Sequence, residues 1–371
     1  MRVAIDASPA GKTPRTGTEL YTLQLILSLA RLDTQNEYTL FLNRQVPEEF
    51  AGLPANVKPQ QKPQRWLWAQ TRLAWGLRRL SPDVFFTPAN VLPFLHPPRS
   101  VITIHDVAFH LFPECYSPFV RWYLDLTTSF ALRHASKVIS VSGATKDDLI
   151  QIYDADPSRI EVIHSGVPTA GGGRPSSAEI ATTLRHYGIV EPYLLYLGRL
   201  EAKKNVARIV EAFFALKQQG IPHRLVLGGT PGVGFTEIKR LIEASPFKRD
   251  IILTGYVGRE KEALYAGADV FVFPSLYEGF GFPILEAARC GTPVVSSSSS
   301  SLPEVAGRAA LLVDPLSVDE IAEAVLRLVR DQNLRAQLVR VGYERLQDFD
   351  WGHTAAKVLA VLEQVGHGAS F

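Results

Sequence analysis

The sequence predicts an α/β protein made of two doubly wound, Rossmann-like domains with parallel sheets. Short apolar runs alternate with longer amphipathic stretches along the whole chain, which is typical of parallel sheets covered by helices. The chain has 371 residues, which is enough for two domains at roughly 100–200 residues each. A stretch rich in Gly, Pro and Ser at 168–177 interrupts the alternation near the middle and predicts an interdomain linker.

The first half contains six short apolar runs that we interpret as strands, with helices such as Glu19–Leu32 and Ala144–Tyr153 between them. These strands are Val3–Asp6, Tyr38–Leu42, Val84–Thr87, Ser100–His105, Lys137–Val141 and Ile160–Ile163. The second half repeats the rhythm, with predicted strands at Tyr193–Tyr196, Arg224–Leu227, Ile251–Leu253, Val270–Phe273, Pro293–Ser296 and Ala310–Leu312. A last helix is predicted over Asp350–Val365. Doubly wound domains bind ligands beyond the carboxyl ends of their strands, so we expect function in the loops that follow the strands.

The composition excludes several classes of protein. Hydrophobic residues make up 46% and charged residues 20%, so a disordered chain is excluded. Lys and Arg number 39 against 37 acidic residues, and this net charge of +2 is too small for a general nucleic-acid binder. Cys115 and Cys290 have no partners at disulfide or zinc spacing, which fits a reducing cytoplasm. We expect neither a signal peptide nor a spanning helix.

The richest segment follows the predicted strand 270–273. Its loop contains Gly279 and Gly281, and Pro283 stands where a helix begins. A strand, a glycine-rich turn and a helix N-terminus together form an anion site, because free backbone amides and the helix dipole face the loop. Glu278 precedes this turn and Glu286 is expected in the first helical turn. Carboxylates there are expected to accept hydrogen bonds from a polyol such as a ribose or hexose; the alternative is a solvated Glu and a Glu that complements the dipole.

A second basic segment follows the predicted strand 193–196. Arg199 and Lys204 are placed to neutralise a pyrophosphate and to stabilise it as a leaving group. The alternative is surface charge before a helix, and we assign Lys203 to that class.

Together these segments closely resemble the retaining glycosyltransferases of family 4, group 1 type, and in particular the branch that contains mannosyltransferases and other hexosyltransferases of polysaccharide assembly. The matching segments are 278–286, 198–205, 288–295, 301–305, 309–315, 101–106 and 141–142. The resemblance implies the GT-B fold, in which two Rossmann-like domains face a central cleft and a C-terminal helix crosses back to the first domain. The implied domains are 1–170 with about 352–371 on the acceptor side, a linker at 171–187, and a donor-binding domain at 188–351.

The resemblance also implies roles for single residues. Glu286 would hold the ribose hydroxyls, Glu278 the hydroxyls of the donor sugar, and Arg199 and Lys204 the diphosphate. Further donor-binding positions are Gly17, Gly279, Phe280, Gly281, Ile284 and Leu285. His105 is implied as a catalytic residue beside the reacting sugar, together with Glu278, Arg199 and Lys204. A lone His is more often structural, and Asp106 is an obvious partner for it.

Two segments depart from the family pattern. The loop before the first long helix has a single matching glycine, Gly17, where relatives often have a pair, and Thr18 there can serve as a plain helix cap. The run Ser296–Ser301 replaces a segment in which relatives often have Asn, and on the sequence alone it is a plain turn.

Metal and dinucleotide sites are not expected. The two Asp-x-Asp pairs at 154–156 and 348–350 have the positions of caps and turn formers, and the family is metal-independent. The glycine-rich segment 228–234 lacks the spacing of a dinucleotide fingerprint and is expected to be a mobile loop. No cofactor is expected beyond the nucleotide sugar itself.

The segment 62–79 is basic and rich in Trp. As a helix it would align Arg65, Trp68, Arg72, Trp75 and Arg79 on one stripe. Such a helix could contact an anionic membrane that carries a lipid-linked acceptor; alternatively, the Trp side chains complete the core of the first domain. The sequence leaves both open.

The sequence therefore predicts a retaining hexosyltransferase that moves a sugar, with mannose from GDP-mannose as first choice, to a hydroxyl of a glycan or glycolipid. We expect it in the cytoplasm or at the inner face of the membrane, with no nucleic-acid partner. A sugar-nucleotide epimerase on the same fold and a catalytically silent nucleotide-binding protein remain as alternatives.

Overall fold

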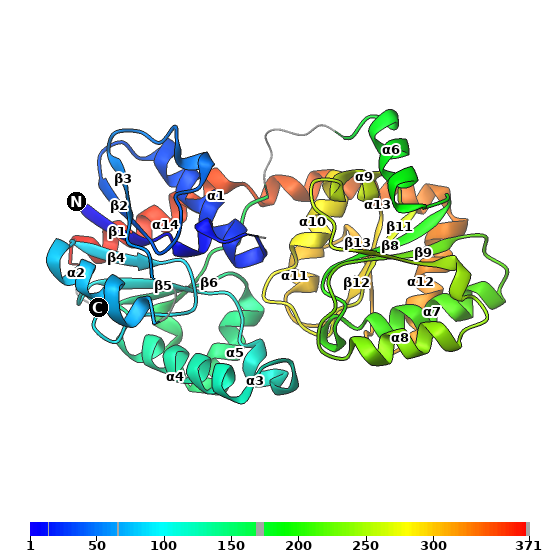
Figure 1. Ribbon diagram of the computed structural model, residues 1–371, viewed down its shortest axis with the longest axis horizontal. Coiled ribbons are helices and arrows are strands. Elements are labelled where there is room, and N and C mark those ends of the chain that lie inside the picture. The colour runs from blue at the N-terminus through cyan, green and yellow to red at the C-terminus, as the bar shows by residue number, and fades with distance from the viewer. Residues whose placement is uncertain (14, 65–66, 168–173, 369–371) are drawn as a thin grey trace. The chain divides into compact units, whose positions relative to one another are not determined.

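A computed structural model describes the chain except for residues 14, 65–66, 168–173 and 369–371. The chain divides into two compact units (Figure 1). The first unit combines Met1–Pro168 with Phe349–Phe371, and the second unit is Thr169–Asp348. Each unit is a parallel sheet covered by helices, so the predicted pair of doubly wound domains is confirmed.

The first unit contains a seven-stranded sheet in the order β3-β2-β1-β4-β5-β6-β7, and every pairing is parallel. Its strands are β1 Arg2–Asp6, β2 Glu37–Leu42, β3 Val57–Gln61, β4 Val84–Thr87, β5 Ser100–Ile104, β6 Lys137–Ser140 and β7 Ile160–Val162. Strand β3 was not predicted. It is a sheet edge with the sequence Val-Lys-Pro-Gln-Gln, whose polar residues and Pro59 give it no apolar run.

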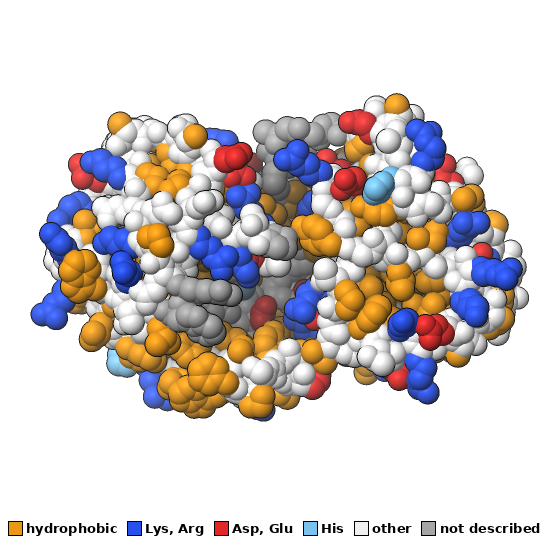
Figure 2. All heavy atoms as spheres, in the orientation of Figure 1, with side chains coloured by type: hydrophobic (Ala, Val, Ile, Leu, Met, Phe, Trp, Pro, Cys, Tyr) orange, Lys and Arg blue, Asp and Glu red, His pale blue; other side chains and the backbone are white. Residues whose placement is uncertain are grey.

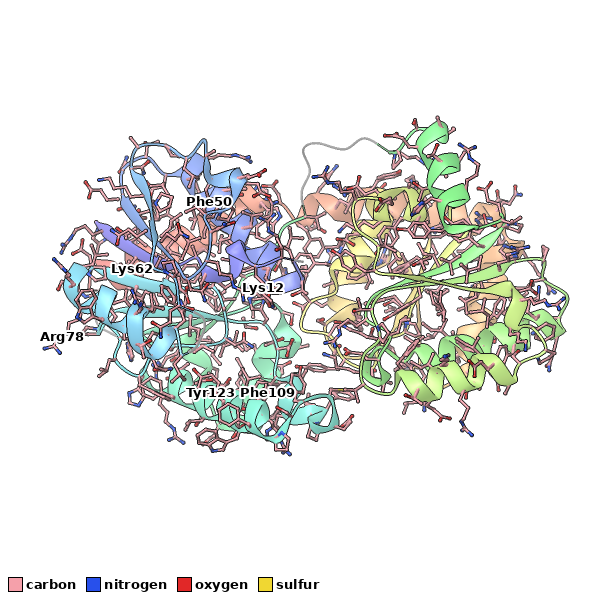
Figure 3. All side chains as sticks on the ribbon, in the orientation of Figure 1. Lys12, Phe50, Lys62, Arg78, Phe109 and Tyr123 are labelled. Carbon is pink, nitrogen blue, oxygen red and sulfur yellow. The ribbon has the colours of Figure 1, made fainter. Side chains whose placement is uncertain are left out.

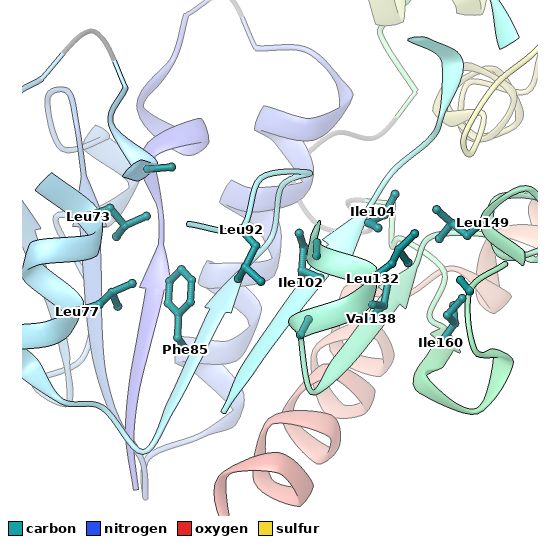
Figure 4. Packing of buried hydrophobic residues seen from close by; sticks show 14 of the residues in the cluster. Leu73, Leu77, Phe85, Leu92, Ile102, Ile104, Leu132, Val138, Leu149 and Ile160 are labelled. Carbon is teal, nitrogen blue, oxygen red and sulfur yellow. The ribbon is translucent and has the colours of Figure 1, made fainter. Parts of the chain in front are cut away.

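Helices cover both faces of this sheet. They are α1 Gly17–Leu32, α2 Ala74–Leu80, α3 Ala108–Leu111, α4 Pro118–His134, α5 Gly143–Tyr153 and α14 Trp351–Gly366. Figure 4 shows part of the core of this unit, a cluster of buried hydrophobic residues that includes Leu77, Phe85, Ile102 and Leu132. Full burial of a side chain of this kind contributes about 1.5–3 kcal/mol relative to exposure.

The C-terminal helix α14 belongs to the first unit, as the family resemblance implied. It packs against α1, and its Trp351 is buried beside Tyr21. The Thr354 hydroxyl donates to the His164 carbonyl, and Arg99 donates to the Gly366 carbonyl. Both ends of this helix are therefore bonded to the first unit.

The second unit contains a six-stranded parallel sheet in the order β10-β9-β8-β11-β12-β13. Its strands are β8 Tyr193–Leu197, β9 Arg224–Gly228, β10 Ile251–Gly255, β11 Val270–Phe273, β12 Val294–Ser297 and β13 Ala310–Val313. Its helices are α6 Ser177–Tyr187, α7 Val206–Gln218, α8 Phe235–Ala244, α9 Lys261–Gly267, α10 Phe282–Arg289, α11 Leu302–Ala306, α12 Val318–Arg330 and α13 Gln332–Arg345.

The segment expected as a linker, 171–187, is only partly one. Residues 171–173 lie outside the described part of the chain, but 177–187 form helix α6, which packs on α9. A capping box between Ser176 and Glu179 starts the helix, and Gly188 ends it at a φ of 64°. The polar residues Ser176 and Glu179 therefore mark the start of a helix, although the Gly and Pro residues before them favoured the interpretation as a linker.

The Trp-rich segment also differs from the single helix that was expected. Residues 65–66 lie outside the described residues, Leu67 has a φ of 51°, and a π-helical turn at Ala69–Leu73 precedes α2. Trp68 is buried and donates its indole N–H to Asp6, whereas Trp75 is 60% exposed. The predicted stripe is therefore divided, because its first Trp belongs to the core and its second to the surface.

Candidate active site

The second unit gathers several predicted site residues at one edge of its sheet. Strands β8, β11 and β12 are neighbours and parallel, so the loops after their carboxyl ends lie side by side. These three loops carry Arg199 and Lys204, then Glu278, and then the serine run.

The loop after β11 ends in a tight turn into α10. Gly281 stands before the helix at a φ of 121°, and a Cβ there would lie 2.8 Å from a methyl group of Leu302. Phe280, Ile284 and Leu285 are buried, so only their backbone can face a ligand. Glu286 lies in the second turn of α10 rather than the first, because the helix begins at Phe282.

Lys204 and Glu278 form an ion pair. The Lys204 Nζ lies 2.6 Å from Oε1 and 2.7 Å from Oε2 of Glu278. Both side chains are largely buried, with 16% and 13% of their surface exposed. The structure thus brings together the residue predicted to bind phosphate, Lys204, and the residue predicted to bind the sugar, Glu278, and each charge compensates the other.

Asn205, the residue after Lys204, links the loops around this ion pair. It follows Lys204 in the left-handed conformation, at a φ of 62°, and is buried. Its side-chain amide donates to the carbonyls of Pro274 and Pro315 at 2.9 and 2.6 Å. One amide group therefore ties together the loops that follow β8, β11 and β13.

Glu286 has two partners that sequence reasoning missed. The Lys261 Nζ lies 2.5 Å from Oε1, and the Tyr265 hydroxyl donates to Oε2 at 3.3 Å. Burial, and then the nearby Glu286 charge, hold the pKa of Tyr265 well above its ordinary value, so this phenol stays protonated. Lys261 and Tyr265 are four residues apart on α9, and this spacing on a helix next to α10 was the available signal.

Arg199 is the most open of the predicted donor ligands. Its side chain is 61% exposed and its Nε lies 3.6 Å from the Glu201 carboxylate. The glycine run 228–234, expected as a mobile loop, is hydrogen-bonded along this segment: Gly198 N–H donates to Gly228, and Leu200 N–H to Thr230. A Cβ on Gly229 would lie 1.8 Å from the Gly198 carbonyl oxygen, so these glycines allow two backbones to touch.

In the first unit, His105 directly follows β5. Its Nε2 lies 2.8 Å from the Pro88 carbonyl, which can only accept, so Nε2 carries a proton and the neutral ring keeps Nδ1 as an acceptor. Burial lowers the pKa of His105 and outweighs the Pro88 carbonyl and the carboxylates of Asp106 and Glu19, which raise it. The hydrogen bond described for the His105 ring is the one to Pro88, while the Asp106 carboxylate accepts from Ala108 N–H.

Gly17 is the first residue of α1, and Thr16, not Thr18, caps the helix. Thr16 and Glu19 form a capping box, and Lys12 donates to Glu19 at 2.6 Å (Lys12 is labelled in Figure 3). Burial raises the pKa of Glu19, but hydrogen bonds from Lys12 and Thr16 outweigh it and keep the net pKa below the ordinary value. An ionised carboxylate therefore already complements the N-terminus of α1.

The two Asp-x-Asp pairs act as helix caps and turns. Asp154 ends α5 in the left-handed conformation, and Asp156 accepts from Ser158. Asp350 caps α14 by accepting from two backbone N–H groups, and Asp348 pairs with Arg345. Within the described residues, no three His, Cys, Asp or Glu side chains converge as a metal site would require.

Comparison with known families assigns both halves of the chain. Residues 188–345 match the family of group 1 glycosyl transferases, and residues 15–170 match Glycosyltransferase Family 4. Among curated proteins, the O-antigen chain mannosyltransferase B of Escherichia coli is 29% identical, over 97% of this chain and 98% of that protein.

Solved structures share the fold over almost the entire chain. The sucrose-phosphate synthase of Thermosynechococcus elongatus superposes with a TM-score of 0.75 at 20% identity, covering 98% of this chain and 99% of that one. HepE of Anabaena, solved with UDP and glucose, also gives 0.75, at 19% identity, covering 98% of this chain and 100% of that one. At such identities the likeness establishes the fold alone.

Proposed function

Because the chain belongs to the group 1, family 4 glycosyltransferases, we propose that it transfers a hexose, with retention of configuration, from a nucleoside diphosphate sugar to a hydroxyl of a glycan or glycolipid. The observation that carries this proposal is the pair of Lys204 and Glu278 beside the N-terminus of α10. It offers a cation for a diphosphate, a carboxylate for sugar hydroxyls and backbone N–H groups for an anion in one place.

We propose mannose from GDP-mannose as the donor. The supporting observation is the likeness over nearly full length to a protein named as a mannosyltransferase. UDP-glucose is the competing choice, since one structural neighbour was solved with UDP and glucose.

The contacts within the second unit support the roles that we propose for its residues. Glu286 would bind the ribose hydroxyls, while Lys261 and Tyr265 hold its carboxylate in place. Lys204, with the exposed Arg199, would neutralise the diphosphate as it departs, when its negative charge is greatest. Glu278 would orient the donor sugar by accepting hydrogen bonds from its hydroxyls.

The proposed chemistry is substitution on one face of the sugar. Retention by two displacements needs a carboxylate nucleophile on the face opposite the leaving group, but Glu278 and Glu286 are both engaged by lysines. In the proposed step, the bond from the anomeric carbon to the acceptor oxygen forms as the bond to the phosphate oxygen breaks. The acceptor proton passes to the departing phosphate.

His105 of the first unit is proposed to contact the reacting sugar. As a neutral ring it can accept a hydrogen bond at Nδ1, while the Pro88 carbonyl holds Nε2–H. Its lowered pKa keeps it neutral around pH 7.

The main test is ligand-induced stabilisation followed by product analysis. The proposal expects one nucleotide among UDP, GDP and ADP, and its sugar conjugate, to raise the melting temperature, because a ligand of the native state stabilises it by mass action. NMR of the glycoside product should show the anomeric configuration of the donor. Conversion of the free nucleotide sugar without any acceptor would indicate an epimerase instead, and binding without turnover a silent protein.

We also propose that the reaction needs no metal ion. The expected result is unchanged activity in excess EDTA, with phosphate charge neutralised by Lys204 and Arg199. A loss of activity in EDTA that Mg²⁺ or Mn²⁺ restores would contradict this proposal.

For the acceptor side, we propose that the first unit contacts an anionic lipid surface. Phe119, Trp122 and Leu126 of α4 are exposed, and Figure 2 shows hydrophobic side chains gathered over this helix. Gln70 joins α4 to the basic segment, because it contacts the Tyr123 hydroxyl and accepts from Phe94 N–H (Tyr123 and Lys62 are labelled in Figure 3). The surface thus extends beyond the predicted segment 62–79.

The basic segment supplies the matching charge. Lys62 and Arg79 both lie over the Trp75 ring, at 5.7 and 5.5 Å from its centroid. Burial and then the neighbouring Arg79 and Arg72 charges lower the pKa of Lys62, which shows that these cations crowd together. Phosphate headgroups would relieve that repulsion.

Flotation with liposomes containing phosphatidylglycerol tests this contact. We expect binding in low salt that falls in high salt and in a Trp122→Ser variant, but not in Tyr343→Ser, which alters an exposed aromatic residue of the second unit. Absence of flotation in low salt would remove the membrane contact. Among the described residues, no helix is both long and apolar enough to span a bilayer.

A further inference from the structure

We propose that two hydroxyls of the serine run, those of Ser300 and Ser301, are positioning groups that hold Glu278 for the donor sugar. This inference rests on the proposed function, since it assumes that Glu278 binds that sugar. Sequence reasoning had treated the run 296–301 as a plain turn.

The two hydroxyls hold the backbone of Glu278 from both sides. Glu278 N–H donates to the Ser300 hydroxyl at 3.0 Å, and the Ser301 hydroxyl lies 2.8 Å from the Glu278 carbonyl oxygen. The Ser301 hydroxyl also lies 2.6 Å from the Phe280 carbonyl, so its single proton serves two residues of the same loop. With Lys204 on the carboxylate, backbone and side chain of Glu278 are both held.

The geometry of the run is specific rather than that of a generic turn. Ser300 has a φ of 52°, which is uncommon for a residue other than glycine, and this conformation accompanies a hydroxyl that faces the loop after β11. Ser301 is fully buried, although it is polar. By contrast, Ser298 is exposed, so its hydroxyl faces solvent.

The loop needs such support because of its own sequence. Glu278 is followed by Gly279 and, two residues later, by Gly281, and glycines allow the backbone many conformations. The ion pair alone cannot define the position of the carboxylate, because a lysine side chain is long and can follow a moving partner. A sugar, however, is held productively only when its ligands stay within about 0.5 Å of their places. The two serines connect this loop to the segment between β12 and α11, in which Ser301 stands directly before the helix.

Loss of these hydroxyls should therefore weaken the binding of the nucleotide sugar more than the binding of the free nucleotide. We propose to measure the dissociation constants of GDP and GDP-mannose, with UDP and UDP-glucose as a second pair, on the full chain. The variants are Ser300→Gly, which tolerates the positive φ, and Ser301→Ala. Ser298→Ala is the matched control from the same run.

The expected result is a loss of affinity for the preferred nucleotide sugar of about tenfold in Ser300→Gly and Ser301→Ala, the effect of one lost hydrogen bond. Affinity for the free nucleoside diphosphate should stay within about twofold, and Ser298→Ala should match the wild type. A change that only weakens the fold would lower both affinities together. Equal losses for both ligands, or no loss, in the two variants would overturn the proposal.

A Glu278→Gln variant separates this proposal from the function on which it rests. The sugar-dependent affinity is the gain in affinity of the nucleotide sugar over the free nucleotide. If Glu278→Gln loses this gain while both serine variants keep it, the positioning role is wrong and the proposed function stands. If Glu278→Gln and also Glu278→Ala, which removes both acceptor oxygens, keep the sugar-dependent affinity, Glu278 does not bind the sugar, and both proposals fail at this residue.

Discussion

Replacing Lys204 and Glu278 singly and then together measures how strongly this ion pair supports the second unit before any ligand binds. The variants are Lys204→Met and Glu278→Gln, each close in size to the original side chain. The pair is short, at 2.6 Å, and largely buried. At that separation an effective dielectric constant of about 20 gives a gross attraction of roughly 6 kcal/mol.

Most of this attraction is offset by the desolvation of both charges, which costs several kcal/mol per ion. The desolvation cost of each charge cancels in a double-mutant cycle, which isolates the attraction between the two side chains, and for residues in contact we expect a coupling energy of about 1–3 kcal/mol. Lys204→Met should be the more harmful change, at about 2–4 kcal/mol, because it leaves the Glu278 carboxylate ionised and nearly buried without its cation.

Thermal unfolding of the four proteins provides the assay. For a domain of this size, about 1 kcal/mol corresponds to a shift in melting temperature of about 2–4 °C, so Lys204→Met should lower the melting temperature of the second unit by roughly 4–15 °C. The double variant should lose clearly less than the sum of the two single changes. Strict additivity, with a coupling energy below about 0.5 kcal/mol, would refute the view that the two charges stabilise each other.

Three other changes test the two units separately. Glu286→Ala should reduce the rise in melting temperature that the preferred nucleotide produces. Glu262→Ala, which breaks an ion pair elsewhere on α9, should leave that rise unchanged. An equal rise in both variants would exclude Glu286 from the site. Burial lowers the pKa of His105 from 6.5, so the unfolded chain takes up a proton at a higher pH than the folded chain, and the first unit should lose stability as the pH falls below 6.5. His105→Gln should make the stability of this unit less dependent on pH. An unchanged slope of stability against pH in this variant would contradict the prediction. Asn205→Asp replaces the amide donor with a carboxylate that would face two loop carbonyls, so it should cost more free energy of unfolding in chemical denaturation than Asn205→Gly. The glycine keeps the positive φ and should lose about 1–3 kcal/mol; the reverse order would show that the hydrogen bonds from the amide do not stabilise these loops.

The sequence predicted the sheets well because buried parallel strands are continuous apolar runs. Strand β11, with the sequence Val-Phe-Val-Phe, is an example, and its position next to β8 follows from the doubly wound topology. Strand β3 escaped prediction, because an edge strand keeps its polar residues in solvent and shows no such run. Helix α6 escaped because its capping signals lie beside the residues of the linker.

Within the candidate site, the sequence located the charges but not their partners. Lys204 and Glu278 were expected near one ligand, and their direct pairing depends on how two loops from different strands meet. Lys261 was missed because its spacing of four residues from Tyr265 becomes informative only when α9 packs on α10 and brings both side chains to Glu286. The serine run was interpreted as a plain turn for the same reason, because the hydrogen-bond partners of a hydroxyl on another loop are visible only in the folded structure.

Helix α14 makes the first unit a product of both ends of the chain. During synthesis, residues 1–168 leave the ribosome long before Trp351 and Val358, whose buried side chains fill the space beside α1. The second unit, in contrast, is contiguous and can complete its sheet while the last helix is still being made. We therefore expect the nascent chain to contain a complete second unit while the first unit is still incomplete. A chain that stops at residue 348 would therefore keep the whole second unit but leave the first unit without α14.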